Sequence, residues 1–117
     1  MDDGLRVLLV GDLHANTRAA FEVIDHSSVV GADLILQLGD FGFWPRDLQG
    51  QSFLRKVERH LALRGLDLSW IDGNHEDFDR LAALPVGGDG RRQISEHVWH
   101  LPRGYRWQWG DTTWVAV

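Results

Sequence analysis

The sequence predicts an α/β fold that begins with a parallel sheet and continues into an antiparallel β-meander. Three short apolar runs, at residues 6–10, 32–38 and 66–72, are each followed directly by a glycine and are typical of buried strands. Helical patterns separate these runs, and strand–helix alternation favours right-handed crossovers between parallel strands. Because 117 residues suffice for one small core, we expect a single domain over residues 1–117.

The helices are predicted from apolar spacing and from residues that cap helix ends. Asn16 can cap a helix that runs to about residue 28. A second helix is expected over residues 51–64, and Gly65 is well placed to end it. A short helix is expected over residues 76–84, followed by a Gly-rich and Pro-containing break at residues 85–90.

The last segment predicts antiparallel strands at residues 94–101, 105–109 and 112–117, separated by turn sequences. This segment holds four of the six tryptophans: Trp99, Trp107, Trp109 and Trp114. A sheet that ends early leaves an unpaired edge, so we expect self-association through the C-terminal strand edge.

Composition and charge exclude several classes of partner. A net charge of −5 argues against a broad nucleic-acid footprint, so no long nucleic acid is expected as a partner. The longest apolar stretches are far too short to cross a membrane. The absence of cysteine excludes disulfides and thiolate metal sites. The acidic start, Met1–Asp3, lacks the pattern of a signal peptide, and we therefore expect a cytoplasmic protein.

Residues of the kinds that bind metals follow each predicted parallel strand. Residues 11–14 read Gly-Asp-Leu-His, residues 39–42 read Gly-Asp-Phe-Gly, and residues 73–76 read Gly-Asn-His-Glu. The carboxyl ends of parallel strands meet at one edge of a sheet, which is where ligands bind in such folds. The sequence therefore predicts that these three stretches lie together.

The residue types in these stretches suit a pair of divalent ions. Asp12 and His14 alternate along an extended chain, so both can point the same way. Asp40 has two carboxylate oxygens and can bridge two ions, and Asn74 supplies a neutral amide oxygen. Two metals about 3.5–4 Å apart can bind phosphate oxygens and stabilise an in-line displacement. His75 is then free to act on a substrate.

In order and spacing, these three stretches resemble the first three motifs of the calcineurin-like metallophosphoesterases over roughly residues 5–117. The resemblance implies a metal-dependent hydrolase that cleaves a phosphomonoester, or a phosphodiester such as a nucleotide, by a metal-bound hydroxide. It implies two divalent metal ions, and the identity of the metal stays open among Mn, Fe, Zn, Ni and Mg. It also implies that the chain is a truncated version of a four-layer α/β/β/α sandwich.

Carried over by position, the resemblance implies a role for each residue. Asp12 and His14 would hold the first metal, and Asp40 would bridge both metals. Asn74 would hold the second metal and touch the phosphate. His75 would stabilise the transition state or protonate the leaving group, which makes Asn74 and His75 the catalytic candidates. The sequence leaves either Asp72 or Glu76 as the partner of His75.

The family completes its site with three further histidines on a Gly-His tip and a later Gly-His-x-His tip, and this chain has no Gly-His-x-His. Its remaining histidines are poor substitutes, and His97 and His100 should face opposite sides of a strand. We therefore expect a domain that is incomplete at its C-terminus. The alternative function is a catalytically impaired homologue that acts as a binding or oligomerisation module.

Two other features have simpler structural interpretations. The aromatic residues beside Asp40 are expected to pack within their loop rather than to stack against a ring of the substrate. They are Phe41, Phe43 and Trp44. The pair Arg91–Arg92 favours a solvated loop over a phosphate clamp.

Overall fold

The structure is a computed structural model that describes residues 5–117, so the acidic Met1–Asp3 start lies outside the described residues. The elements in chain order are β1 (Val7–Val10), α1 (Thr17–Val29), β2 (Leu34–Gln37), α2 (Leu48–Arg64), β3 (Asp67–Ile71), α3 (Phe78–Ala83), β4 (Arg92–Ser95), β5 (Val98–Leu101), β6 (Arg106–Trp109) and β7 (Thr112–Val115).

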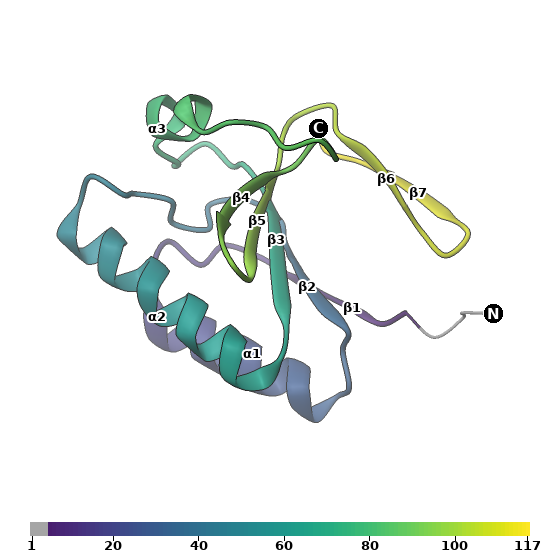
Figure 1. Ribbon diagram of the computed structural model, residues 1–117. Coiled ribbons are helices and arrows are strands. Elements are labelled where there is room, and N and C mark those ends of the chain that lie inside the picture. The colour runs from purple at the N-terminus through teal and green to yellow at the C-terminus, as the bar shows by residue number, and fades with distance from the viewer. Residues whose placement is uncertain (1–4) are drawn as a thin grey trace.

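A five-stranded sheet forms the centre of the fold, with strand order β1-β2-β3-β5-β4 (Figure 1). The pairs β1–β2, β2–β3 and β3–β5 are parallel, and only the edge strand β4 is antiparallel. The predicted start of strand, helix, strand, helix, strand, helix is therefore confirmed. Val10 lies opposite Gln37, which lies opposite Trp70, so the carboxyl ends of the first three strands are level.

The predicted β-meander is wrong in its first strand. Residues 94–101 do not form one strand but two, β4 and β5, which turn at Glu96 and His97. Strand β5 then joins the central sheet parallel to β3, while β6 and β7 form a separate antiparallel hairpin. Three of the four β5 residues are buried, as expected of a strand inside a parallel sheet.

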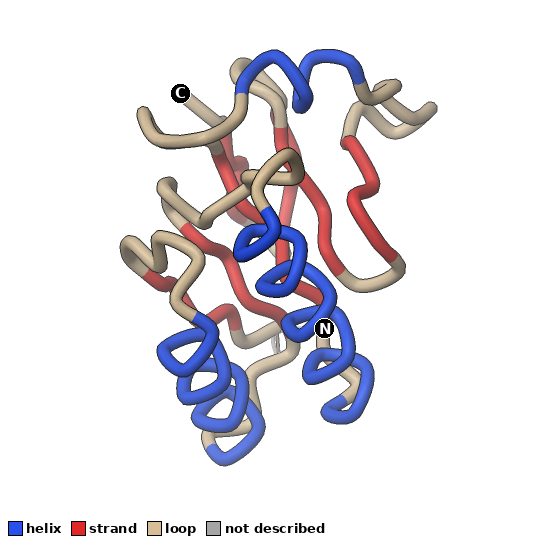
Figure 2. The backbone as a smooth tube through the Cα atoms, turned by 90° about the vertical axis from the view of Figure 1, so that its left-hand side faces the viewer, coloured by secondary structure: helices blue, strands red, loops and turns tan. Residues whose placement is uncertain are grey.

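Each face of the sheet has its own apolar cluster. Helices α1 and α2 lie together on one side of the sheet, as Figure 2 shows from the helix side, and the larger cluster fills the space beneath them. Its fully buried side chains include Ile24, Phe53, Val57 and Trp70. The β6–β7 hairpin lies on the other side, where its tryptophans pack with Leu36.

The helix ends agree with local sequence signals. Asn16 caps α1 by accepting a hydrogen bond from the backbone N–H of Ala19 (3.0 Å), as predicted. Gly65 ends α2 in a left-handed conformation with φ 66°, also as predicted. Helix α2 begins at Leu48, earlier than expected, because Asp47 accepts a hydrogen bond from Gly50 and caps it there.

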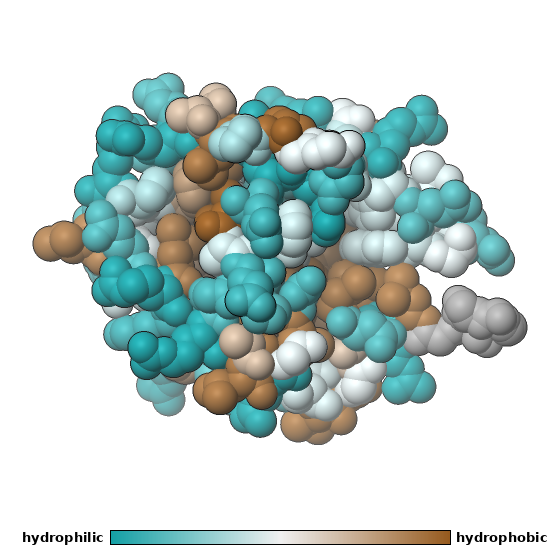
Figure 3. Space-filling view, in the orientation of Figure 1, coloured by the Kyte–Doolittle hydropathy of each residue, from teal (hydrophilic) through white to brown (hydrophobic). Residues whose placement is uncertain are grey.

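Apolar and polar residues are interleaved on the face shown in Figure 3. Among residues 5–117, none of the helices combines the length and the apolar character that crossing a membrane requires.

A partly buried ion pair joins α2 to the turn between β4 and β5. Glu58 accepts hydrogen bonds from the Ser95 hydroxyl (2.6 Å) and from the backbone N–H of His97 (2.7 Å). Its second oxygen lies 2.6 Å from Nδ1 of His97. Burial opposes ionisation of Glu58, but these hydrogen bonds outweigh it and lower its pKa. The hydrogen bond to Glu58 raises the pKa of His97 despite burial.

We expect Glu58→Gln to destabilise the protein most between pH 4.5 and 6.5, the ordinary pKa values of the two groups. The contribution of Glu58 is present above its ordinary pKa and is lost as pH falls through its lowered folded pKa. The contribution of His97 to stability is present below its ordinary pKa and is lost as pH rises through its raised folded pKa. Urea denaturation across this range measures the difference, with the exposed Glu22→Gln as control. A difference independent of pH would contradict the prediction.

Candidate metal centre

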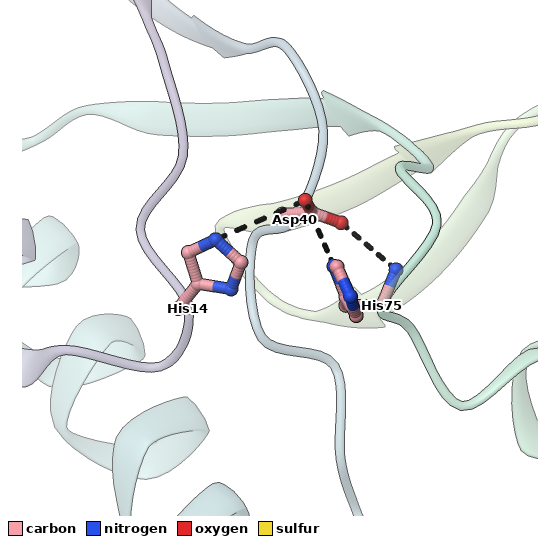
Figure 4. Close-up of side chains that lie close together, drawn as sticks. All are labelled: His14, Asp40 and His75. Atoms are coloured by element: carbon pink, nitrogen blue, oxygen red, sulfur yellow. Dashed lines mark hydrogen bonds and ion pairs between the residues drawn. The ribbon is translucent and has the colours of Figure 1, made fainter.

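The three predicted stretches meet at the carboxyl edge of the sheet. His14 lies in the loop after β1, Asp40 in the loop after β2 and His75 in the loop after β3. Their side chains point toward one another in Figure 4, and one ligand atom from each lies within 4.8 Å of the others. The topology thus gathers residues from positions 14, 40 and 75 into a group that can hold a metal ion.

Asp40 is the centre of this group. Its Oδ2 lies 3.2 Å from Nδ1 of His75 and 3.8 Å from Nε2 of His14. Asp12 joins from the side, with its Oδ2 3.4 Å from Nε2 of His14. The Asp40 side chain is only 11% exposed, whereas those of His14 and His75 are 46% and 60% exposed. The carboxylate is therefore held at the base of a group that opens to solvent.

Asn74 also reaches this carboxylate. One amide atom of its side chain lies 3.2 Å from each Asp40 oxygen and 3.0 Å from Nδ1 of His75. The structure places the amide oxygen there, facing acceptors; with the amide turned over, its nitrogen donates to them instead. The fit to a divalent ion therefore rests on the imidazole nitrogens of His14 and His75 and the carboxylate oxygens of Asp40, which are ligand atoms that divalent ions bind.

The backbone at Asp40 has a rare conformation. Its φ is 54°, in the left-handed region that non-glycine residues seldom adopt. The carbonyl oxygen of Asp40 accepts hydrogen bonds from the backbone N–H groups of Leu13 (3.1 Å) and His14 (2.8 Å), which fasten the first loop to the second. Gly73 completes this arrangement, because a Cβ at that position would collide with the backbone N and Oδ1 of Asp40.

His75 pairs with neither of the two partners expected from the sequence. Its backbone N–H donates to Oδ1 of Asp40 (2.9 Å), and its ring lies against Oδ2 of the same carboxylate. Asp72 instead binds His100 and Arg103. The expectation of Asp72 or Glu76 as partner is therefore wrong, since the residue that contacts His75 is Asp40, in the loop after the neighbouring strand β2.

Glu76 lies beneath the loops and holds them together. Its buried carboxylate accepts hydrogen bonds from the backbone N–H groups of residues 41–43, at 3.1 to 3.2 Å. It also accepts from the indole N–H of Trp70 (3.2 Å) and the backbone N–H of Gly73 (3.4 Å). A buried carboxylate is tolerated only when it is satisfied in this way. Sequence reasoning named Glu76 only as a partner for His75 and missed this role.

Gln37 is a second supporting residue that sequence reasoning missed. It is fully buried at the end of β2, where its amide nitrogen donates to the carbonyl oxygens of Gly11 and Gly39. Its amide oxygen accepts from the backbone N–H of Gly39 (2.9 Å). The ends of β1 and β2 are thereby tied together. The signal in the sequence that could have indicated this role was a single polar residue inside an otherwise apolar strand.

Hydrogen bonding keeps Asp40 ionised. Burial of the carboxyl opposes ionisation, but the hydrogen bonds from the backbone and ring of His75 outweigh it, and the pKa of Asp40 is lowered. At neutral pH the group is therefore an anion with two oxygens available to a cation.

The aromatic loop after Asp40 packs, as predicted. Phe41 and Phe43 are buried, and both lie close to Trp70. Trp44 donates its indole N–H to the carbonyl oxygen of His75 (2.6 Å). Phe41 and Phe43 therefore support the loops from within, whereas Trp44 is partly exposed and lines a cavity beside α3.

Three other histidines have partners of their own and do not belong to the group of His14, Asp40 and His75. His60 pairs with Asp25 (2.7 Å) between α1 and α2. His97 pairs with Glu58 in a turn rather than along a strand, and His100 is buried beside Asp72.

Comparison with known proteins agrees with this geometry. The family model of the calcineurin-like phosphoesterases matches residues 5–113. The chain belongs to the calcineurin-like phosphoesterase family. No curated protein and no solved structure matches the chain. The family is a hydrolase superfamily whose members bind divalent metals. The group of His14, Asp40 and His75 lies at the carboxyl ends of parallel strands, where ligands bind in folds of this kind.

We expect Glu76→Gln to lower the free energy of unfolding by about 1–3 kcal/mol, because the amide nitrogen would replace an acceptor with a donor facing backbone N–H groups. Chemical denaturation at pH 7 measures this loss. Glu22→Gln, on the exposed side of α1, is the matched control and should change stability little. Equal losses in the two variants would show that Glu76 does not organise the loops.

Proposed function

We propose that this protein is a metal-dependent phosphoesterase that hydrolyses a phosphomonoester or a phosphodiester, such as a nucleotide. The convergence of His14, Asp40 and His75 from three strand ends, within 4.8 Å of one another, carries the proposal. Membership of a phosphoesterase family supports the same reaction class.

In this proposal each ligand has the role implied by its position. Asp12 and His14 would hold one divalent ion, Asp40 would be shared with a second, and Asn74 would help to hold the second. The short separations of Asp40 from His14 and of Asp12 from His14 support the first assignment. Bound divalent ions would neutralise phosphate oxygens and acidify a water molecule for attack on phosphorus.

His75 is the residue proposed to act on the substrate. A carboxylate can only accept, so contact with Asp40 places the ring proton on Nδ1 and fixes the orientation of the imidazole. Nε2 then faces away from Asp40 on a side chain that is 60% exposed. From there it can contact a phosphoryl oxygen or pass a proton to the leaving oxygen. Asn74 is proposed to touch the phosphate from the adjacent position.

We expect hydrolysis of p-nitrophenyl phosphate or bis(p-nitrophenyl) phosphate that depends on added Mn²⁺. Asp40→Asn removes the bridging charge and should lower kcat/KM by about 100-fold or more. Asp111→Asn, in the exposed turn of the β6–β7 hairpin, is the matched control and should retain activity.

Titration calorimetry with Mn²⁺ separates metal binding from catalysis. Binding that is lost in Asp40→Asn, without turnover in the wild type, would favour the binding-module alternative. Hydrolysis that survives Asp40→Asn would instead indicate a contaminating enzyme and contradict the proposal.

We also propose that copies of this chain associate through the β6–β7 hairpin. Within the described residues these two strands pair only with each other, so each has an outer edge without a strand partner. Val115, on β7, is half exposed, and the indole N–H groups of Trp107 and Trp114 are buried without a hydrogen-bond partner in residues 5–117. Such an edge favours pairing with a second copy.

Size-exclusion chromatography with light scattering tests this association. We expect a dimer or larger species whose fraction rises with concentration and falls in Val115→Lys, because a lysine opposes strand pairing at an edge. Val29→Lys, at the exposed end of α1, is the control and should leave the distribution unchanged. A clean wild-type monomer at high concentration would refute the proposal.

A further inference from the structure

A cavity lies on the same edge of the sheet as the candidate metal ligands. Its volume is about 460 Å³. Its lining residues are Asp72, Phe78, Leu81, Ala82, Arg92, His100, Pro102 and Arg103. They come from the end of β3, from α3, from β4, and from β5 with the loop that follows it. None of the residues assigned above to metal binding lines this cavity, so it is a separate feature.

The polar side of the cavity is a connected set of three side chains. The Asp72 carboxylate, 8% exposed, accepts hydrogen bonds from Nε2 of His100 (3.0 Å) and from Nε of Arg103 (3.2 Å). Because a carboxylate can only accept, this contact places the proton of a neutral His100 ring on Nε2. Asp72 thus contacts both neighbours, of which His100 is buried and Arg103 is 69% exposed.

His100 lines the cavity with a neutral imidazole ring, and one of its ring nitrogens has no hydrogen-bond partner in the described residues. Burial lowers its pKa, against the opposing effect of Asp72, so the ring is uncharged at neutral pH. The side chain is 2% exposed, and its Nδ1 makes no hydrogen bond to any residue from 5 to 117. A buried acceptor without a partner is uncommon in a folded protein.

Two arginines give the cavity a positive charge. Arg103 is held through its Nε by Asp72, and Arg92 through its Nε by the carbonyl oxygen of Leu84 (3.0 Å). In the described part of the chain, the Nη groups of both remain without hydrogen-bond partners. Two guanidinium groups and one carboxylate therefore line this cavity, in a protein whose net charge is −5. The expectation that Arg92 lies in a solvated loop is wrong, because it is half-buried in β4.

The opposite wall is apolar. Phe78, Leu81 and Ala82 project from α3, and Pro102 closes the far side. We propose that this cavity binds a small organic anion, with its phosphate or carboxylate group on Arg92 and Arg103 and an apolar ring against α3. Guanidinium groups oriented through Nε suit both kinds of oxyanion, because their remaining N–H groups form a planar fork.

Titration calorimetry or NMR of the full chain in EDTA tests the proposal without any contribution from bound metal. We expect phenyl phosphate or benzoate to bind the wild type, and the comparison of these probes distinguishes a phosphate from a carboxylate head group. The double variant Arg92→Gln/Arg103→Gln should raise the Kd of the bound probe at least tenfold. Arg55→Gln/Arg59→Gln, on the exposed side of α2, removes the same charge elsewhere and should leave the Kd unchanged.

Four further outcomes support or overturn the proposal. Binding by Asp40→Asn with unchanged Kd, together with a change in the ¹⁵N shifts of the His100 ring, supports a site separate from the metal centre. Equal Kd values in the two arginine double variants, or no binding of either probe, would overturn the proposal. If inorganic phosphate binds as tightly as phenyl phosphate, the proposed contact between the ring of the ligand and the apolar side chains of α3 is wrong. None of these outcomes depends on phosphoesterase activity.

Discussion

The buried carboxylate of Glu76 is the interaction on which the candidate metal centre depends. The chain leaves β2 with a sharp bend at Asp40, and the backbone N–H groups of residues 41–43 then point inward, where water cannot satisfy them. Glu76 accepts hydrogen bonds from all three, and from the indole N–H of Trp70. A buried anion and several buried donors would each destabilise the fold alone, but together they satisfy one another. Because Glu76 directly follows His75, the same contact sets where the third loop lies against the second.

The three loops are consequently one unit rather than three independent tips. Asp40 receives backbone hydrogen bonds from the first loop through its carbonyl oxygen, and from His75 in the third loop through its carboxylate. Gly73 allows this approach, because any side chain there would occupy the position of Asp40. A metal centre built this way has its donor atoms oriented before an ion arrives, which reduces the cost of ordering them on binding. The flanking cavity shares the same support, since Asp72 immediately precedes Gly73.

Much of the fold and of the candidate site could be predicted because the signals are local. An apolar run followed by glycine marks the end of a buried strand, and parallel strands bring those ends to one edge, so Asp12, His14 and Asp40 could be expected together. The break between β4 and β5 could not be predicted in the same way. No glycine or proline marks it, and it depends on Glu58, which is 39 residues before His97 in the chain. A turn stabilised by a distant helix leaves no local pattern.

The sequence by itself determined the element types, the candidate metal ligands and the resemblance to a phosphoesterase family, because these depend on residue type, order and spacing. Only the tertiary structure decided which polar groups satisfy one another. It paired His75 with Asp40, gave Glu76 a supporting role, and placed Arg92 in a cavity beside Arg103. The physical reason is that a buried hydrogen bond is specified by both partners and by the packing between them, and the partners here lie up to 35 residues apart.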